Sequence, residues 1–194
     1  MKTLIIHPTD PSTSFLDIVY APIENKTVIT GGISKSEVQQ LIREHDRVMM
    51  MGHGSPNGLF SVGKFSGANG LIIDHTTVSL LKEKDNSVFI WCWASEFVKN
   101  YKLSGFSSGM FISEVGEASH CSKYDQTVDD LLKIKLSTVI QEEVDESNYG
   151  FCNIIAKHIN QDKNLIHENV KKEYGIIAEN NPVAFYNNNR LHKS

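Results

Sequence analysis

The chain has 194 residues, of which 40% are hydrophobic and 22% are charged, a balance typical of a globular domain with a sizeable core. Its formal net charge of −4 argues against nucleic-acid binding and against attraction to an anionic membrane surface. No apolar run is long enough to span a bilayer, and the stretch Leu4-Ile5-Ile6 is too short for a signal peptide. Three irregularly spaced cysteines, Cys92, Cys121 and Cys152, argue against a disulfide framework, so we expect a reducing, cytoplasmic location.

The predicted elements alternate between strands and helices over the first 113 residues. A strand at 2–6 precedes a short helix at 15–20 and a second strand at 26–30. Ser34 and Glu37 have the spacing of a capping box and predict the start of a helix. The remaining expected elements, in order, are a strand at 47–51, a hairpin of 59–62 and 71–74, a helix at 76–84, a strand at 88–92, a helix at 96–101 and a fifth strand at 109–113.

Beyond residue 126 the sequence is mostly helical, with apolar spacing that indicates helices near 128, over 139–159 and over 164–174. The tail after Asn181-Pro182 is expected to be irregular or to form a final short strand. Residues 141–146 make an acidic helix face, which is solvated by default. A Ca²⁺ ion or a basic partner is the alternative.

This alternation predicts one α/β domain over residues 1–194, a three-layer sandwich with a mostly parallel sheet. The catalytic core is expected at about 1–120 and a helical part at about 121–194. Ligands of such sheets bind outside the carboxyl ends of the strands. Four reactive side chains are predicted at or just past strand ends: His7, His53, Cys92 and Glu114.

His53 and Cys92 carry the chemical prediction. A thiol must lose its proton before it attacks a carbonyl carbon, and a nearby imidazole can accept that proton. The resulting oxyanion needs N–H donors, for which the backbone amides of Gly54 and Cys92 are suitable. The alternative is a solvated histidine in a glycine turn and a cysteine that is merely part of the core.

The pattern of an apolar strand followed by His-Gly (48–54), and then an apolar strand ending in cysteine (88–92), resembles the caspase-like cysteine peptidases. The similarity spans roughly residues 2–117 and implies a sheet of the caspase or flavodoxin-like type. It implies that His53 is the general base and acid, that Cys92 is the nucleophile, and that Gly54 and Cys92 form the oxyanion hole without a metal or cofactor. Trp91 and Trp93 flank the cysteine here, where a caspase has Gln-Ala-Cys-Arg-Gly.

The resemblance also implies that specificity is set near the ends of the first and fifth strands. Asp10, Glu114 and Glu117 occupy those places and no arginine does, so charge complementarity predicts cleavage after Arg or Lys. Asp10 is explained equally well as part of the Asp-Pro-Ser-Thr turn and helix cap. Trp93 either lines the substrate pocket or packs beneath the nucleophile.

Other constellations are weaker. His120-Cys121 lacks zinc-ligand spacing, and His7 is more readily explained as a strand-end side chain than as a catalytic group. The glycines at 52, 54 and 58 do not match a phosphate-binding motif, although a nucleotide enzyme on a flavodoxin-like sheet stays an alternative. The other alternative to the peptidase is a catalytically inactive binding or regulatory protein of the same fold. We expect a peptide or protein substrate, with no nucleic-acid or membrane partner.

Overall fold

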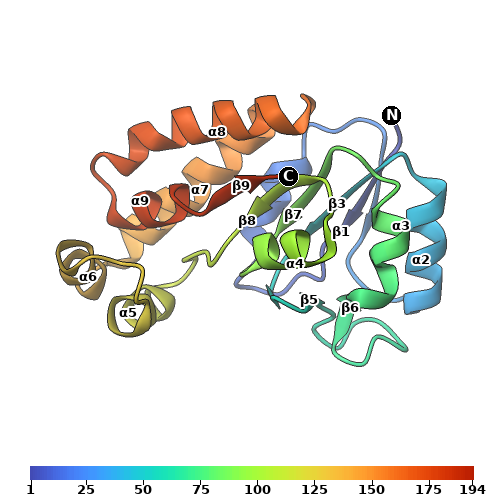
Figure 1. Ribbon diagram of the computed structural model, residues 1–194, viewed down its shortest axis with the longest axis horizontal. Coiled ribbons are helices and arrows are strands. Elements are labelled where there is room, and N and C mark those ends of the chain that lie inside the picture. Colours follow the sequence, from blue (N-terminus) through green and yellow to red (C-terminus); the bar gives the residue numbers. More distant parts are fainter.

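A six-stranded sheet forms the middle layer of the molecule, which the computed structural model describes over residues 1–194 (Figure 1). The strand order is β2-β1-β3-β7-β8-β9, in which the first five strands are parallel and β9 is antiparallel. A separate antiparallel sheet, β4-β5-β6, follows β3. The strands are β1 Thr3–Ile6, β2 Lys26–Ile29, β3 Arg47–Met51, β4 Gly54–Ser55, β5 Gly58–Phe60, β6 Leu71–Ile73, β7 Ser87–Ile90, β8 Gly105–Ser108 and β9 Leu191–Lys193.

Nine α-helices cover this sheet and extend beyond it, so the predicted three-layer α/β architecture is confirmed. None of them is long and apolar enough to cross a membrane. The helices are α1 Asp17–Tyr20, α2 Lys35–Glu44, α3 Val78–Leu81, α4 Ala94–Tyr101, α5 Val115–Tyr124, α6 Asp130–Ser137, α7 Gln141–His158, α8 Lys163–Ala178 and α9 Pro182–Asn188, with 3₁₀ turns at Ser14–Leu16 and His75–Thr77.

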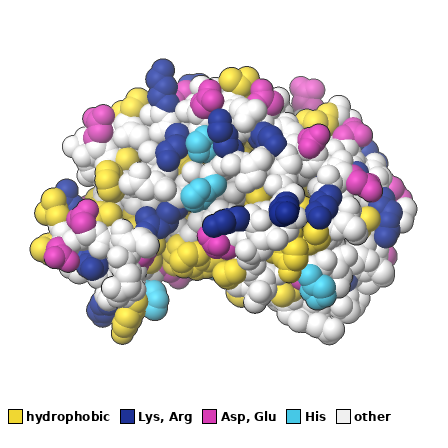
Figure 2. Space-filling model, viewed as in Figure 1, with side chains coloured by type: hydrophobic (Ala, Val, Ile, Leu, Met, Phe, Trp, Pro, Cys, Tyr) yellow, Lys and Arg dark blue, Asp and Glu magenta, His cyan; other side chains and the backbone are white.

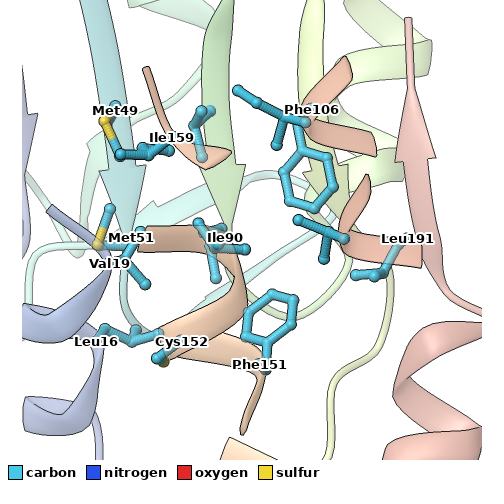
Figure 3. Close-up of a cluster of buried hydrophobic side chains, with 14 of the residues drawn as sticks. Leu16, Val19, Met49, Met51, Ile90, Phe106, Phe151, Cys152, Ile159 and Leu191 are labelled. Atoms are coloured by element: carbon cyan, nitrogen blue, oxygen red, sulfur yellow. The ribbon is translucent and has the colours of Figure 1, made fainter. Parts of the chain in front are cut away.

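Two hydrophobic cores lie on opposite faces of the sheet because successive strand residues point to opposite sides. Val48 and Met50 of β3 pack with α2, α3 and α4, whereas Met49 and Met51 pack with α1, α7 and α8. Figure 3 shows the second of these cores, where Met51 and Ile90 of the sheet lie beside Cys152 of α7. Every residue of β3 is buried, as its almost wholly apolar sequence predicts.

Local sequence signals locate several of the elements correctly. The strand expected at 47–51 is β3, and the expected hairpin is β5 with β6. Ser34 caps α2 as predicted. Its Oγ accepts from the Glu37 N–H at 3.2 Å, and the Glu37 carboxylate accepts from the Ser34 N–H at 2.7 Å. The final short strand is β9, which closes the edge of the sheet.

The prediction of a fifth strand at 109–113 is wrong, because the fifth strand of the parallel sheet is β8 at Gly105–Ser108. Its Gly-Phe-Ser-Ser sequence has little strand character. Glycine is required at 105, since a Cβ there would lie 2.3 Å from the Ser87 carbonyl oxygen. Ser108 is fully buried, and its hydroxyl donates to the Trp91 carbonyl oxygen at 2.9 Å. Tertiary contacts therefore stabilise a strand that local preference does not predict.

Three helical predictions also need correction. Residues 76–84 form a 3₁₀ turn and the short helix α3 rather than one longer helix. Helix α5 was not predicted, and Glu114 caps it instead of ending a strand, six residues beyond β8. The tail is helical over α9, where Asn187 is fully buried and bonds both backbone groups of Ile112. Helices α5 and α9 pack with α6 around a third hydrophobic cluster.

Candidate active site

The carboxyl ends of β1, β3, β7 and β8 meet at one edge of the sheet because these strands are parallel. In the space-filling view the lower edge of the molecule is hollowed between α5–α6 and the β5–β6 hairpin, with hydrophobic side chains on its floor (Figure 2). Ligands of open α/β sheets bind at such an edge. The candidate site is therefore built from the residues that directly follow these strands.

His53 and Cys92 follow adjacent strands. β3 and β7 are paired in parallel, and the bond from the Gly52 N–H to the Ile90 carbonyl oxygen, at 3.0 Å, continues their pairing beyond β3. Both side chains line one crevice of about 30 Å³. The two residues predicted to react thus share a cavity at the carboxyl edge of the sheet.

Cys92 sits at a sharp turn from strand to helix. The next residue, Trp93, has left-handed backbone angles of φ 70° and ψ 21°, which are strained for a side chain of this size. The Trp93 N–H donates to the Gly109 carbonyl oxygen at 3.0 Å, and the Ala94 N–H donates to the Trp91 carbonyl oxygen at 3.1 Å. The N–H of Cys92 donates to no protein acceptor. This turn leaves one backbone donor uncommitted, beside the thiol and near the amino terminus of α4.

Gly54 is held close to the same crevice by Trp91. A Cβ at position 54 would lie 2.2 Å from Trp91 Cδ1, so no larger residue fits without movement. The Phe60 N–H donates to the His53 carbonyl oxygen at 2.8 Å, which makes 53 and 60 a hydrogen-bonded pair. Hydrogen-bonded and non-hydrogen-bonded pairs alternate along antiparallel strands, so Gly54 and Leu59 form a non-hydrogen-bonded pair. The Gly54 N–H therefore donates no hydrogen bond to β5.

His53 is oriented by the loop that follows β1. Its Nε2 lies 2.7 Å from Ser12 Oγ and 3.1 Å from Asp10 Oδ2. Ser12 Oγ also donates to Asp10 Oδ1 at 2.7 Å. Partial burial raises the pKa of Asp10, but the hydrogen bonds from Ser12 and the interaction with His53 outweigh it and leave the pKa below its ordinary value. Asp10, for which the sequence predicts a role in substrate binding, forms a carboxylate–imidazole pair with His53 in this structure.

Cys92 is half-buried. Its sulfur donates to the Phe111 carbonyl oxygen at 3.5 Å, and no hydrogen bond joins it to His53. Burial, followed by the negative charge of Glu117, raises the pKa of the Cys92 thiol to about 12. A crevice of about 30 Å³ holds roughly one water molecule and no peptide. Phe111 thus covers one side of a half-buried thiol, whose raised pKa favours the protonated form.

A larger cavity of about 420 Å³ adjoins this crevice, with Phe15 and Ser113 lining both. The loop after β1, the segment after β8 and helix α7 form its walls. Glu114 is exposed and lines it, in agreement with the predicted position between the first and fifth strands. Asp145 and Asn148 of α7 line it too. Asp145 belongs to the acidic face predicted at 141–146, whereas the sequence gave no reason to single out Asn148.

Glu117 and Trp93, which the sequence also predicts to bind substrate, lie outside both the crevice and the adjoining cavity. The Glu117 carboxylate accepts from the backbone N–H groups of Ser113 and Glu114, at 2.7 and 3.2 Å, and so caps α5. Trp93 is 43% exposed and lines a separate cavity of about 520 Å³ with Arg190. Neither residue lines the crevice of Cys92 or the cavity of Glu114.

The structure therefore brings His53 and Cys92 to one crevice, pairs Asp10 with His53, packs Gly54 against Trp91 and places Glu114 in the adjoining cavity. The residues missed from the sequence are Ser12, Phe111, Asp145 and Asn148. Two of them had a local signal, because Ser12 lies in the same turn as Asp10 and Asp145 lies in the acidic face predicted at 141–146.

His7 is fully buried at the end of β1, where its Nδ1 lies 3.2 Å from Asp17 Oδ1. No group of three or more His, Cys, Asp or Glu side chains is arranged to hold a metal ion, and His120 and Cys121 belong to no such group. Comparisons of the chain with family models, with curated proteins and with solved structures find no match.

Proposed function

We propose that this protein is a cysteine endopeptidase with Cys92 as nucleophile and His53 as general base and acid. The observation that supports this most directly is the convergence of the two side chains, from adjacent parallel strands, on one crevice at the carboxyl edge of the sheet. A thiol and an imidazole so placed are the minimum equipment for acyl transfer through a thioester. The resemblance of the two motifs to caspase-like peptidases supports the same function.

The reaction begins when His53 accepts the proton of the Cys92 thiol. The thiolate attacks the carbonyl carbon of the scissile peptide bond, and the N–H groups of Cys92 and Gly54 donate to the oxyanion. The C–N bond then breaks as His53 returns the proton to the departing amine, which leaves a thioester on Cys92. Water attacks the thioester with His53 again acting as base, and the acid product and the free thiol are released. Asp10 holds the imidazole and stabilises its protonated form.

Catalysis requires residues 109–113 to move. The Phe111 carbonyl oxygen accepts a hydrogen bond from the Cys92 thiol, and the crevice is too small for a peptide. Movement of this segment admits water and substrate. The burial that raises the Cys92 pKa is then removed, and proximity to a protonated His53 lowers the pKa further. The structure corresponds on this proposal to a resting state whose nucleophile is protected.

The preference for a basic residue before the scissile bond is part of this proposal. Glu114 lines the cavity that adjoins the crevice, and Ser12 connects that cavity to His53. No lysine, arginine or histidine lines it, so an acidic substrate side chain would meet only repulsion there. Cleavage after Arg or Lys is the expected specificity.

A catalytically inactive binding or regulatory protein is the second candidate. The raised pKa of Cys92, the small volume of the crevice and the absence of a hydrogen bond between Cys92 and His53 favour it. The two candidates differ in whether any ligand turns Cys92 into a nucleophile.

Two reagents distinguish the endopeptidase from the inactive protein: a peptidyl-arginine chloromethyl ketone, and a panel of fluorogenic peptides ending in Arg, Lys or Asp. The endopeptidase should cleave the basic peptides, and the ketone should alkylate Cys92, as mapped by mass spectrometry. Cys92→Ala and His53→Ala should abolish cleavage, whereas Cys121→Ala, which removes a thiol outside the crevice, should retain it. Cleavage by Cys92→Ala at the rate of the parent would overturn the proposal. Folded protein that neither cleaves nor reacts with the ketone would establish the inactive alternative.

A further inference from the structure

We propose that the open edge of β9 and the adjacent face of α8 form a docking surface for an acidic peptide segment of a partner protein, bound in extended conformation. This basic edge consists of Lys163, His167 and Lys171 of α8 with His192 and Lys193 of β9. None of these residues lines the crevice of Cys92 or the cavity of Glu114. The inference therefore goes beyond the proposed peptidase function and does not depend on it.

Helix α8 runs beside β9 in the opposite direction (Figure 1). Near the start of the helix, Lys163 donates to Ser104 Oγ, which in turn donates to the Ser194 carbonyl oxygen just after β9, at 3.5 Å. About one turn later, His167 Nε2 donates to the carbonyl oxygen of Leu191, the first residue of β9, at 3.2 Å. The helix therefore follows the strand from its end to its start.

The basic side chains of α8 repeat at an interval that suits an extended chain. Lys163, His167 and Lys171 are four residues apart, so they share one face of α8 and lie about 6 Å apart along its axis. Side chains on one face of a strand repeat about every 6.7 Å. A peptide with an acidic residue at every second position can therefore align its acids with this row.

The positive charge of the basic edge is only partly compensated. Lys163 and Lys171 form no ion pair. Lys193 Nζ lies 3.4 Å from Glu168 Oε1, but both side chains are exposed, and pairs of this kind contribute little. In Figure 2, Lys and His side chains gather on the visible face where α8 and β9 lie. Such a surface favours an acidic partner.

The two histidines report the same positive field. Desolvation lowers the pKa of both His167 and His192, and the charge of Lys171 lowers both further. The acidic neighbours that act in the opposite direction are Glu168 for His167 and Glu96 for His192. An acidic side chain bound here would therefore be stabilised by the cations already present.

The strand supplies unpaired backbone groups beside these cations. β9 is last in the strand order, so no strand lies along its outer edge. Gly105 and Ser194 exchange two backbone hydrogen bonds, each at 3.0 Å, and hydrogen-bonded pairs alternate along antiparallel strands. The N–H and C=O of Lys193 therefore point away from β8, and they form no other backbone hydrogen bond. An added strand would pair with them.

The combination of cations and an open strand edge selects a peptide. A nucleic acid would meet the cations but has no backbone that pairs with β9, whereas an extended acidic peptide uses both features. A second copy of this chain would bring its own His192 and Lys193 to the same contact, where like charges oppose pairing.

The probe is fluorescein-(Glu-Thr)4-amide, whose glutamates all fall on one face of a strand, titrated with the full chain at low ionic strength and followed by anisotropy. The (Gln-Thr)4 peptide should bind at least about tenfold more weakly, and added salt should weaken binding of the glutamate peptide. A fully N-methylated glutamate peptide keeps the charges but has no N–H to donate, so it should bind at least about fivefold more weakly.

The matched variants are Lys171→Glu and Lys172→Glu. Lys171→Glu should weaken binding of the glutamate peptide about tenfold, because it reverses the middle charge of the surface. Lys172 is exposed, and its side chain points about 100° away around the helix. Lys172→Glu changes the net charge equally and should alter the affinity less than about twofold.

A separate readout tests the strand pairing. The backbone amide of Lys193 should exchange its hydrogen at least about tenfold more slowly with the glutamate peptide bound, as measured by NMR. Equal binding of the Glu and Gln peptides, or equal effects of the two variants, would overturn the inference. An octathymidylate that binds as tightly as the glutamate peptide, or peptide binding without protection of the Lys193 amide, would indicate a general polyanion surface instead. A dimer of the unliganded chain with a protected Lys193 amide would assign the edge to a second copy.

Discussion

The protection of Cys92 gives a quantitative prediction for its reactivity in the absence of substrate. Desolvation of the half-buried sulfur, followed by the negative charge of Glu117, raises the pKa of this thiol from the ordinary 9.0 to about 12. Only the thiolate reacts with iodoacetamide, so the rate follows the ionised fraction. At pH 8 this fraction is about 10⁻¹ for a pKa of 9 and about 10⁻⁴ for a pKa of 12. Native Cys92 should therefore react about 10³ times more slowly than the same residue in the unfolded chain.

The assay is alkylation between pH 7 and pH 10 under native conditions, followed by mass spectrometry to assign the label to each cysteine. The same chain in urea provides the reference rate. The native rate at Cys92 should rise about tenfold per pH unit without a plateau, since the whole range lies below the raised pKa. Cys152 is fully buried and also has a raised pKa, so it should be the slower of the two if Cys92 is exposed by local movement.

Two results would refute this reasoning. A rate at pH 8 within tenfold of the unfolded reference would mean that the Phe111 carbonyl oxygen and the surrounding side chains do not shield the sulfur. A plateau at or below pH 9 would mean that the thiol ionises normally. Equal rates at Cys92 and Cys152 would instead indicate that labelling requires global unfolding, which contradicts a mobile segment over Cys92 alone.

Three further predictions concern stability, measured by urea unfolding. Gly54→Ala places a Cβ 2.2 Å from Trp91 Cδ1 and should lower the free energy of unfolding by about 1–3 kcal/mol; an unchanged value would contradict the close packing. Tyr174→Phe removes the buried bond between Tyr174 OH and Ser147 Oγ, at 2.6 Å, and should cost about 1–2 kcal/mol, whereas a neutral result would mean that the bond contributes nothing. Burial lowers the pKa of His7, so below about pH 6.5 the unfolded chain binds more protons than the folded one and stability should fall as the pH falls. His7→Gln should make this loss between pH 7.5 and pH 5.5 smaller, and an equally large loss in the variant would show that His7 is not responsible.

Patterns within short segments were sufficient for much of the fold. The apolar run of β3, the capping box of Ser34 and Glu37, and the spacing of the β5–β6 hairpin all depend on neighbouring residues, and each is found where it was expected. The strand β8 was missed for the opposite reason. Its serines and glycine have weak strand preference, and its pairing with β7 on one side and β9 on the other makes it a strand.

Part of the candidate site could also be predicted from short segments and part could not. His53 and Cys92 could be singled out because each is a chemically reactive residue type that follows an apolar run, and parallel strands bring their carboxyl ends to one edge of the sheet. The role of Asp10 could not be predicted. A turn with a helix cap explains this residue locally, and only the fold brings it within 3.1 Å of His53, 43 positions later in the chain.

Periodicity and turn chemistry were enough to predict β3, α2 and the β5–β6 hairpin and to single out His53 and Cys92, because both act over a few consecutive residues. The three-dimensional arrangement alone decided what surrounds them: the shielding of Cys92 by Phe111, and the cavity that Asn148 and Asp145 of α7 complete from the far end of the chain. Burial, the pKa of a thiol and the shape of a cavity depend on groups that are close in space but distant in sequence. No local pattern encodes that proximity.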